Sequence, residues 1–358
     1  MRLSAALPAP SGAIRAVLLA ALASTNLVLS GGLTPVASNE SDAVTVAFAD
    51  RALGDALRGA VAAATPPAPA VTAVKSARAH AAPAKKKTKP AAAPKRWLPT
   101  GTGMWTYQWD QTEHGDARAI VARARFHGVT HLYVRTGTRK GGFDGGPVLE
   151  QLLPATKGTN VKVIAWDFPT LNNPVSDARR LAAAARFTVK GAPRVAAVAP
   201  DIETGSEGTK LSAAGVEKYL KTLRSLLPRN VAIIGVTPWP SEHRIGKYPF
   251  SHVAKYVDAL APMAYWINRD PATVTKQTMW RLAKFHKPVM PIGQAYDPRI
   301  DVPSLRWGPP SKAQVTAFFK TAKTYHAPAA SLWVWQFASH DQWVALHAAR
   351  PLFPARLQ

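Results

Sequence analysis

The sequence predicts an α/β protein whose residues 97–358 form a (β/α)8 barrel. Eight short apolar runs recur along these ~260 residues, and both the number and the total length suit such a barrel. Each run is apolar almost throughout, which is the pattern of strands that are buried on both faces. The segments between the runs repeat their apolar residues at helical spacing.

The eight runs are the expected strands, and each is followed by room for a helix. Alternating strands and helices build a parallel sheet, here closed into a TIM barrel. An open, doubly wound sheet is the alternative, but no run is followed by the Gly-rich phosphate turn typical of that fold. The predicted strands are Met104–Trp109, His131–Thr136, Val161–Phe168, Val195–Ile202, Val231–Thr237, Ala259–Tyr265, Val289–Ala295 and Ser331–Phe337.

Helix-start signals precede three of the segments between strands. Ser311 and Gln314 have the spacing of a capping box. Asp270 stands before Pro271 as an N-cap before a proline in the first turn. Ser212 opens a segment whose apolar residues recur at helical spacing, namely Val216, Leu220, Leu223 and Leu227.

Residues 1–38 have the order of a secretory signal peptide. Arg2 and Arg15 precede the apolar run Ala16–Ser30, and small residues follow it. The run is shorter than the ~20 residues that a membrane-spanning helix needs. We therefore expect export, with cleavage near Ala37–Ser38, and an uncleaved membrane anchor is the alternative.

Residues 39–96 are rich in Ala, Pro and Lys, which predicts a disordered linker. The chain has 45 Lys and Arg against 21 Asp and Glu, a net charge of +24, and the excess extends beyond the linker. A basic surface favours anionic partners. The Lys85–Lys87 run is expected either to bind anionic polymers of the cell envelope or to be a solvated part of the linker.

Composition and motifs exclude several kinds of chemistry. Without any Cys, the chain has no disulfides, thiolate catalysis or Cys-bound metal. The ten His show no HExxH or other ligand spacing, and no GxSxG elbow occurs, so we expect no metal, no cofactor and no serine hydrolase. Nucleic acid is not expected as a partner, because no zinc-finger, RNP-type or helix-turn-helix pattern accompanies the charge.

The carboxyl ends of the predicted strands gather acidic and aromatic residues. In a (β/α)8 barrel this is the end that carries the chemistry. Together these ends hold four Asp, one Glu and at least five Trp. They read Trp109–Asp110, Arg135–Thr136, Trp166–Asp167, Asp201–Glu203, Thr237–Trp239, Tyr265–Trp266, Gln294–Asp297 and Trp335–Gln336.

Asp201 and Glu203 stand two residues apart in VAPDIETG, at the end of the fourth strand. Residues two apart on a strand point to the same side, so both are expected to face the barrel mouth. Two close carboxylates raise the pKa of one of them, which can then act as a general acid near neutral pH. The alternative is that they pair with cations such as Arg135 or Lys210 and only hold loops together.

The tryptophans at the strand ends suit a carbohydrate ligand, because aromatic faces stack on the C–H-rich faces of sugars. Trp280 and Trp343 lie on predicted helices and are expected to belong to the core, whereas Trp105 could face either way. The candidates for sugar contact are Trp109, Trp166, Trp239, Trp266 and Trp335.

The segments APDIET and APMAYW resemble the fourth and sixth strands of family 18 glycoside hydrolases, the chitinase-like barrels. Their fourth strand ends in D-x-x-D-x-D-x-E, and their sixth carries Met-x-Tyr-Asp/Asn. The resemblance matches Glu203 to the family's acid and Asp201 to its last aspartate. It matches Met263 and Tyr265 to the sixth-strand pair, and Trp335 to the floor tryptophan of the last strand.

The chain departs from this pattern at three positions. Ala196 and Ala199 stand where the family has its first two aspartates, and Trp266 replaces the sixth-strand Asp or Asn. In family 18 the substrate's own acetamido group attacks, with support from those aspartates. The chain also resembles family 25 lysozymes, in its fourth-strand D-x-E, in Asp110 after the first strand, and in the closing Trp335–Phe337.

The resemblance implies a glycoside hydrolase acting on a β-linked, amino-sugar-containing polysaccharide such as peptidoglycan or chitin. With the expected signal peptide, the protein is expected to be secreted or envelope-associated, and we expect a monomer. Glu203 is the expected general acid, and Asp201 is expected to orient the substrate or stabilise positive charge. A catalytically inactive carbohydrate-binding barrel and a structural envelope protein are the alternatives. Besides the five strand-end tryptophans, the expected substrate-binding residues are Asp110, Asp167, Met263, Tyr265, Gln294 and Asp297.

Overall fold

The computed structural model describes residues 96–138, 142–300 and 303–354, all within the second of the chain's two units, Thr88–Gln358. The expected signal peptide and all of the expected linker except residue 96 lie outside these described residues. Within them, no helix combines the length and the apolar character that crossing a membrane requires.

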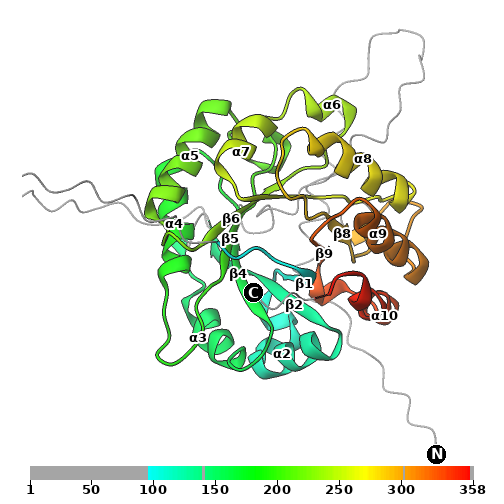
Figure 1. Cartoon of the computed structure of the whole chain (residues 1–358), viewed down its shortest axis with the longest axis horizontal. Coiled ribbons are helices and arrows are strands. Elements are labelled where there is room, and N and C mark those ends of the chain that lie inside the picture. The colour runs from blue at the N-terminus through cyan, green and yellow to red at the C-terminus, as the bar shows by residue number, and fades with distance from the viewer. Residues whose placement is uncertain (1–95, 139–141, 301–302, 355–358) are drawn as a thin grey trace, which may run out of the picture. The chain divides into compact units, whose positions relative to one another are not determined.

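The strands form a parallel sheet that curves into a nearly closed barrel (Figure 1). Neighbours run in the order β7-β6-β5-β4-β2-β1-β9-β8, and the bridges Leu260–Val289 and Met263–Ile292 connect β7 with the β8 segment. Each predicted strand overlaps one barrel strand, so the predicted (β/α)8 barrel is confirmed. The barrel strands are β1 (Gly101–Thr106), β2 (Val129–Thr138), β4 (Lys162–Asp167), β5 (Ala197–Pro200), β6 (Ala232–Thr237), β7 (Ala259–Pro262), β8 (Ile292–Gln294) and β9 (Ala329–Trp333).

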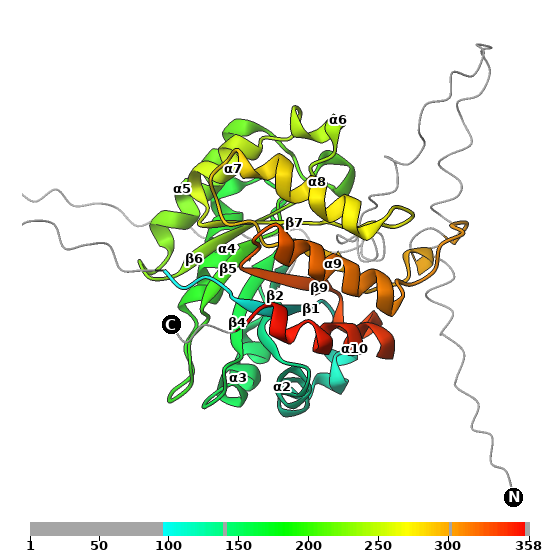
Figure 2. The ribbon, with the colours of Figure 1, turned by 45° about the vertical axis from the view of Figure 1, so that its right-hand side comes forward.

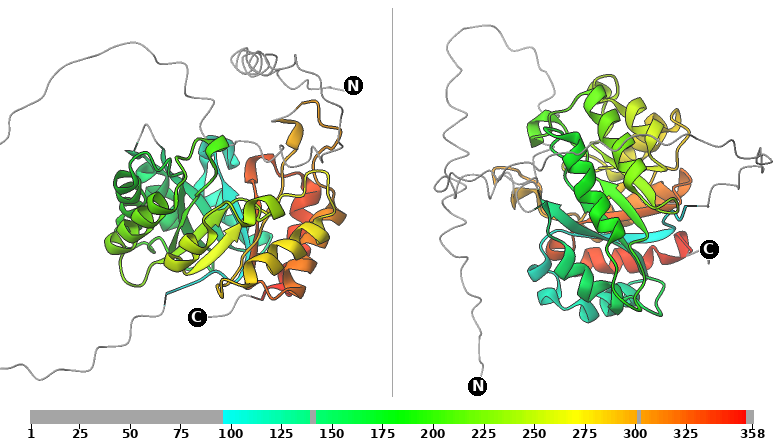
Figure 3. Two further views of the ribbon diagram at one scale, coloured as in Figure 1. Left: turned by 90° about the horizontal axis from the view of Figure 1, so that it is seen from above. Right: turned by 90° about the vertical axis from the view of Figure 1, so that its left-hand side faces the viewer.

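Helices connect consecutive strands and surround the sheet on its outer side (Figures 2 and 3). They are α2 (Ala117–Phe126), α3 (Gly146–Ala155), α4 (Pro174–Arg186), α5 (Ala213–Leu226), α6 (Glu242–Ile245), α7 (Phe250–Tyr256), α8 (Pro271–Ala283), α9 (Lys312–Thr324) and α10 (His340–Ala348).

The three predicted helix starts are confirmed by their cap contacts. Ser311 and Gln314 form the capping box of α9. The Asp270 carboxylate accepts the Thr273 N–H of α8 at 2.7 Å, and the Ser212 hydroxyl accepts an N–H in the first turn of α5. Each cap satisfies a backbone donor that the helix itself leaves without a partner.

Side chains alternate along each strand between the barrel interior and the layer under the helices. On β1, Met104 belongs to the core between sheet and helices, whereas Trp105 stacks on Tyr133 of β2 inside the barrel. The outer layer is mostly Leu, Val, Ile and Ala. Because burying one large aliphatic side chain contributes about 1.5–3 kcal/mol, this layer holds the helices on the sheet.

Two local features differ from the sequence predictions. A short strand, β3 (Gly142–Phe143), pairs antiparallel with the end of β2 and was not predicted, since two residues carry no periodic signal. Trp343 is buried as predicted, but the prediction that Trp280 belongs to the core is wrong, because its side chain is 72% exposed. Trp280 lies one turn after Lys276 on the outer side of α8.

Candidate active site

Two carboxylates lie at the carboxyl end of β5. The Asp201 N–H donates to the Asp167 carbonyl of β4 at 2.9 Å, and Asp201 bridges to Val236 of β6, so the backbone stays fixed past the strand end. Asp201 is 6% exposed and Glu203 is 9% exposed. Ile202 between them belongs to the outer core, so the two carboxylates lie on the opposite, inner side.

The surroundings of this pair favour its protonated form. Burial, together with the negative charges of Asp167 and Glu207, raises the pKa of Asp201 to about 8. Burial, followed by the charges of Asp201 and Glu207, raises the pKa of Glu203 well above its usual value, and Arg244 opposes this shift. The pair therefore retains at least one proton at neutral pH, which is the state a general acid requires.

The alternative role for the pair, in surface ion pairs, does not match its contacts. Among the described residues, no cation forms a salt bridge with Asp201 or Glu203. Arg135 instead lies over the Tyr107 ring, with its guanidinium carbon 4.7 Å from the ring centroid. Lys210 is exposed.

The backbone and hydroxyl groups around the pair form hydrogen bonds with groups other than the two carboxylates. The Tyr248 hydroxyl donates to the Ile202 carbonyl at 2.7 Å, which fixes the residue between the two carboxylates. Glu207 accepts hydrogen bonds from the Thr204 and Ser206 hydroxyls in a short 3-10 turn. One Asp201 carboxylate oxygen, Oδ1, is buried without a hydrogen-bond partner.

Aromatic rings fill the barrel interior near this end. The rings of Trp105 and Tyr133 stack with centroids 3.9 Å apart. Trp166 and Trp333 meet edge to face at 5.5 Å, and both contact Trp105 at 5.7 Å. Tyr107, which follows β1, lies over Trp166 and Trp333 and is partly exposed. The interior therefore presents a floor of aromatic rings.

The last strand contributes Trp333, and not the predicted Trp335, to this floor. Alternation along a strand would give the two residues the same direction, but β9 ends at Trp333 and a 3-10 turn begins at Trp335. Trp335 packs edge to face on Trp343 at 4.6 Å, and its indole N–H donates to Glu113 at 3.1 Å. Its placement in the outer core removes it from the candidate site.

Three other predicted site residues also face the helix layer. Trp266 is buried against Phe318 of α9, and Trp239 belongs to the same outer core. The Asp167 carboxylate forms a 2.8 Å ion pair with Arg180 of α4. Asp167 therefore acts on the pair through its charge, without facing the mouth.

The remaining predicted residues divide between the interior and the loops that follow the strands. Met263 and Gln294 are buried, and Gln294 holds the loop after β7 by accepting the Ile267 N–H at 3.0 Å. Tyr265 is partly exposed and meets Tyr296 edge to face. The structure thus brings Asp201, Glu203, Trp166, Met263, Tyr265 and Gln294 to the interior side, and it places Trp109, Asp110 and Asp297 in the turns after β1 and β8.

No protein-family model matches the sequence, and no curated protein matches it. Solved structures match with low identity over nearly their full length. An endo-1,4-β-mannanase from Rhizomucor miehei has 8% identity and a TM-score of 0.53, with 73% of this chain and 98% of that chain covered. A class V chitinase from Pseudomonas fluorescens has 12% identity and a TM-score of 0.50, with 70% of this chain and 99% of that chain covered. The chain has the fold of these glycoside hydrolase barrels.

Tyr107, Tyr133 and Trp333 were not predicted from the sequence as residues of the barrel interior, and the sequence pattern left the direction of Trp105 open. The strands that carry Trp105 and Trp333 were predicted and are neighbours in the barrel, but the sequence gives no signal for which of their side chains face the interior. Within the described ranges, no three His, Asp or Glu side chains are grouped closely enough to hold a metal ion.

We expect Asp201→Asn to change how stability depends on pH. In the unfolded chain an aspartate titrates near ~3.9, whereas burial raises the pKa of Asp201 to about 8 in the fold. As pH rises between these values, the unfolded state releases a proton that the folded state keeps, so the free energy of unfolding falls. Asparagine carries no such proton. The variant should match the wild type near pH ~4 and melt at a higher temperature near pH ~8.

Thermal unfolding followed by calorimetry from pH 4 to pH 8.5 measures this difference. Asp110→Asn is the matched control, because Asp110 is exposed. Its melting curve should follow the wild type at every pH. A constant offset between Asp201→Asn and the wild type across the range would contradict the assignment of the buried proton.

Proposed function

We propose that this protein is a glycoside hydrolase that uses Glu203 as its general acid. One observation carries the proposal, namely a buried carboxylate pair that keeps a proton at neutral pH, at the strand end of a barrel whose interior is lined by aromatic rings. Carboxyl groups supply the proton in glycoside hydrolysis, and aromatic faces bind sugar rings. The glycosidase fold supports the same assignment.

The proposed step begins with proton transfer from Glu203 to the glycosidic oxygen. The bond between that oxygen and the anomeric carbon breaks, and the leaving sugar departs as an alcohol. Asp201, whose Oδ1 has no protein partner, would orient the substrate in its protonated form, or stabilise the positive charge on the anomeric carbon in its ionised form. Addition of water to that carbon then returns a proton to Glu203.

We further propose a β-linked substrate that contains amino sugars. The match of Glu203 and Asp201, with Met263 and Tyr265, to the chitinase-like motif supports this substrate class. Trp333 and Tyr107 would form the sugar subsite in place of the predicted Trp335, since they lie together inside the barrel with ring centroids 5.9 Å apart.

A carbohydrate-binding barrel without turnover is the second candidate. Ala199 favours it, because this residue lies on β5 beside Trp166 of β4, where the chitinase-like pattern has an aspartate. An alanine methyl group cannot support attack by an acetamido group. The two candidates share the ligand and differ only in whether the glycosidic bond breaks.

A screen of the full chain against peptidoglycan, chitin oligomers and deacetylated chitin separates these candidates. We expect new reducing ends from at least one of the three. Binding without new reducing ends would establish the binding barrel and overturn the hydrolase. Absence of both binding and turnover on all three would overturn the proposed substrate class.

We also propose that the protein acts outside the cytoplasm, in the cell envelope. The order of charged, apolar and small residues in 1–38 supports export, and the basic segment 39–96 supports attachment to anionic envelope polymers. We expect the mature chain to begin near Asn39. N-terminal sequencing of protein recovered from the culture medium and the envelope checks this, and a chain that still begins at Met1 would contradict cleavage.

A further inference from the structure

We propose that the outer surface of α8 and α9 is a second binding site, separate from the barrel mouth, for a linear anionic polysaccharide. The surface comprises Thr273, Lys276 and Trp280 of α8 with Lys320 of α9, and is called here the α8–α9 face. Binding at this face does not depend on whether the barrel hydrolyses a glycosidic bond. Three observations carry it, namely its charge, its exposed tryptophan and the groove between the helices.

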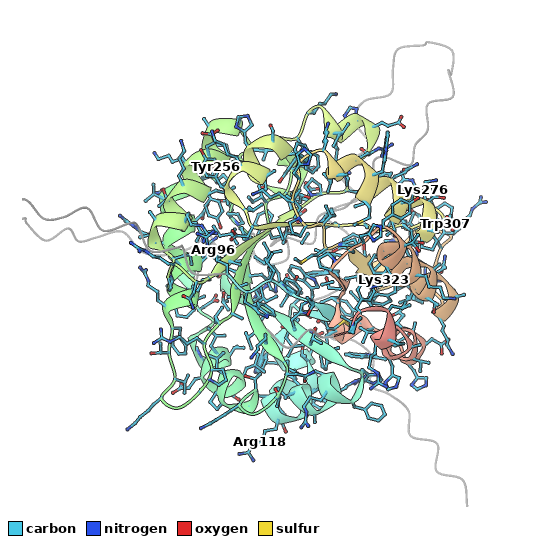
Figure 4. The ribbon with its side chains drawn as sticks, in the orientation of Figure 1. Arg96, Arg118, Tyr256, Lys276, Trp307 and Lys323 are labelled. Atoms are coloured by element: carbon cyan, nitrogen blue, oxygen red, sulfur yellow. The ribbon has the colours of Figure 1, made fainter. Side chains whose placement is uncertain are left out.

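The charge of this face is positive, with one carboxylate, that of the N-cap Asp270, at the start of α8. Neither helix contains an acidic residue between its first and last positions. Lys276 and Lys320 are exposed, and among the described residues neither has a salt-bridge partner. Lys323 lies on another side of α9, with its ammonium 5.9 Å from the Phe353 ring centroid. Figure 4 shows Lys276 on the same side of the barrel as Trp307, a second exposed tryptophan. Such a surface attracts polyanions.

Trp280 places an exposed aromatic ring beside Lys276, one turn further along α8. Its side chain is 72% exposed, and the inner side of α8 is already filled by buried residues such as Val274 and Leu282. Residues three and four apart share one side of a helix, so Thr273, Lys276 and Trp280 form a continuous row. An exposed indole beside ammonium groups can stack on a sugar ring whose acidic substituent pairs with a lysine.

A shallow groove between the two helices supplies hydroxyl groups. Threonine and tyrosine hydroxyls at this groove can donate to the hydroxyls and carboxylates of a sugar and equally to phosphate oxygens, and that of Thr324 already donates to the Lys320 carbonyl at 3.0 Å. The exposed indole of Trp280 is therefore the feature that favours a sugar over polyphosphate. The combination of cation, hydroxyls and an indole therefore favours a pyranose chain with carboxylates. The groove is lined by Ala272, Thr273, Lys276, Thr321, Thr324 and Tyr325.

Titration of the full chain with polygalacturonate, a carboxylated pyranose polymer, tests the proposal. Trp280→Ala should weaken binding roughly threefold to tenfold, the usual range for one aromatic contact. Lys276→Gln should weaken binding and reduce its dependence on salt. The matched controls are Phe126→Ala, an aromatic residue that is 70% exposed on α2, and Lys221→Gln, a lysine paired with Glu217 at 3.3 Å on α5. Both controls should bind like the wild type.

Parallel titrations with polyphosphate and neutral dextran identify the ligand chemistry. We expect polyphosphate binding to be insensitive to Trp280→Ala, and dextran to bind more weakly than polygalacturonate. Equal weakening by Phe126→Ala would overturn the proposal, as would polyphosphate binding that is equally sensitive to Trp280→Ala. A dimer that sedimentation velocity detects and that Trp280→Ala dissociates would assign the face to a second copy of the chain instead. Hydrolysis of short soluble oligomers should be unchanged in Trp280→Ala, which separates this test from that of the proposed function.

Discussion

Replacing Glu203 with glutamine is expected to lower turnover by roughly 10²–10⁴-fold, the usual contribution of a positioned proton donor. Glutamine keeps the size of the side chain and much of its hydrogen bonding, but it has no proton to transfer to the glycosidic oxygen. Binding of the intact substrate should stay close to that of the wild type, because the ground state does not need that proton. Steady-state rates on the substrate from the screen, together with oligomer binding, measure the two effects separately.

Glu207→Gln is the matched control for this substitution. Glu207 is buried close enough to raise the pKa of Glu203, but its carboxylate already accepts two hydroxyl hydrogen bonds. We expect its loss to change turnover by less than about tenfold. Full activity in Glu203→Gln would place the acid elsewhere, with Asp110 and Asp297 as the next candidates. If Glu203→Gln and Asp201→Asn both keep full activity and melt at lower temperatures, the pair is structural.

The barrel could be predicted because strands that are buried on both faces can be located without knowing which of their side chains face the interior. A strand buried on both faces is mostly apolar, and the eight runs show this regardless of which side chain faces the interior. Helix starts such as Ser311 were equally predictable, because a cap involves residues three apart in the sequence. The two-residue strand β3 is defined by its antiparallel pairing with the end of β2. The sequence of Gly142 and Phe143 alone gives no signal for that pairing.

The candidate site was predictable only in part, and for the same reason. Since both faces of a strand are apolar, the pattern does not reveal which tryptophans point inward. Trp333 and Trp335 look equivalent by alternation, and only the end of β9 between them separates the interior from the outer core. Asp201 and Glu203 were found because charge in an apolar run is unusual. Trp280 was assigned to the core from its residue type, although its position on α8 faces solvent.

The partner of Asp167 also depends on how a helix packs on a strand. Arg180 lies on α4, thirteen residues after Asp167, and its guanidinium reaches Asp167 at 2.8 Å and Asp177 at 2.9 Å. It also donates to the Phe168 carbonyl at 3.0 Å. The charged groups are nearly inaccessible, with 7% of the Arg180 side chain exposed. One buried cation therefore neutralises two buried carboxylates beside the β4 end.

We expect Arg180→Met to lower the free energy of unfolding by about 3–5 kcal/mol at neutral pH, the usual effect of leaving a buried charge without its partner. Burial already raises the pKa of Asp167 to about 6 against the effect of Arg180, and loss of Arg180 raises it further. Unfolded aspartate titrates near ~3.9, so the part of the cost that comes from Asp167 is absent near pH ~4 and grows by up to about 1.4 kcal/mol per pH unit above the wild-type folded-state pKa of about 6. Urea unfolding at pH 4.5 and pH 7.5 measures this growth.

Arg179→Met is the matched control, because Arg179 is exposed on the same helix. Its free energy of unfolding should stay within about 0.5 kcal/mol of the wild type. Asp167→Asn added to Arg180→Met should recover part of the loss, since it removes one of the two unpaired charges. The same double variant should move the pH dependence of turnover to lower pH, because the charge of Asp167 is one of the causes that raise the pKa of Asp201. Equal stability of Arg180→Met and Arg179→Met at pH 7.5 would show that the ion pair contributes nothing, and the charge of Asp167 would then need another explanation.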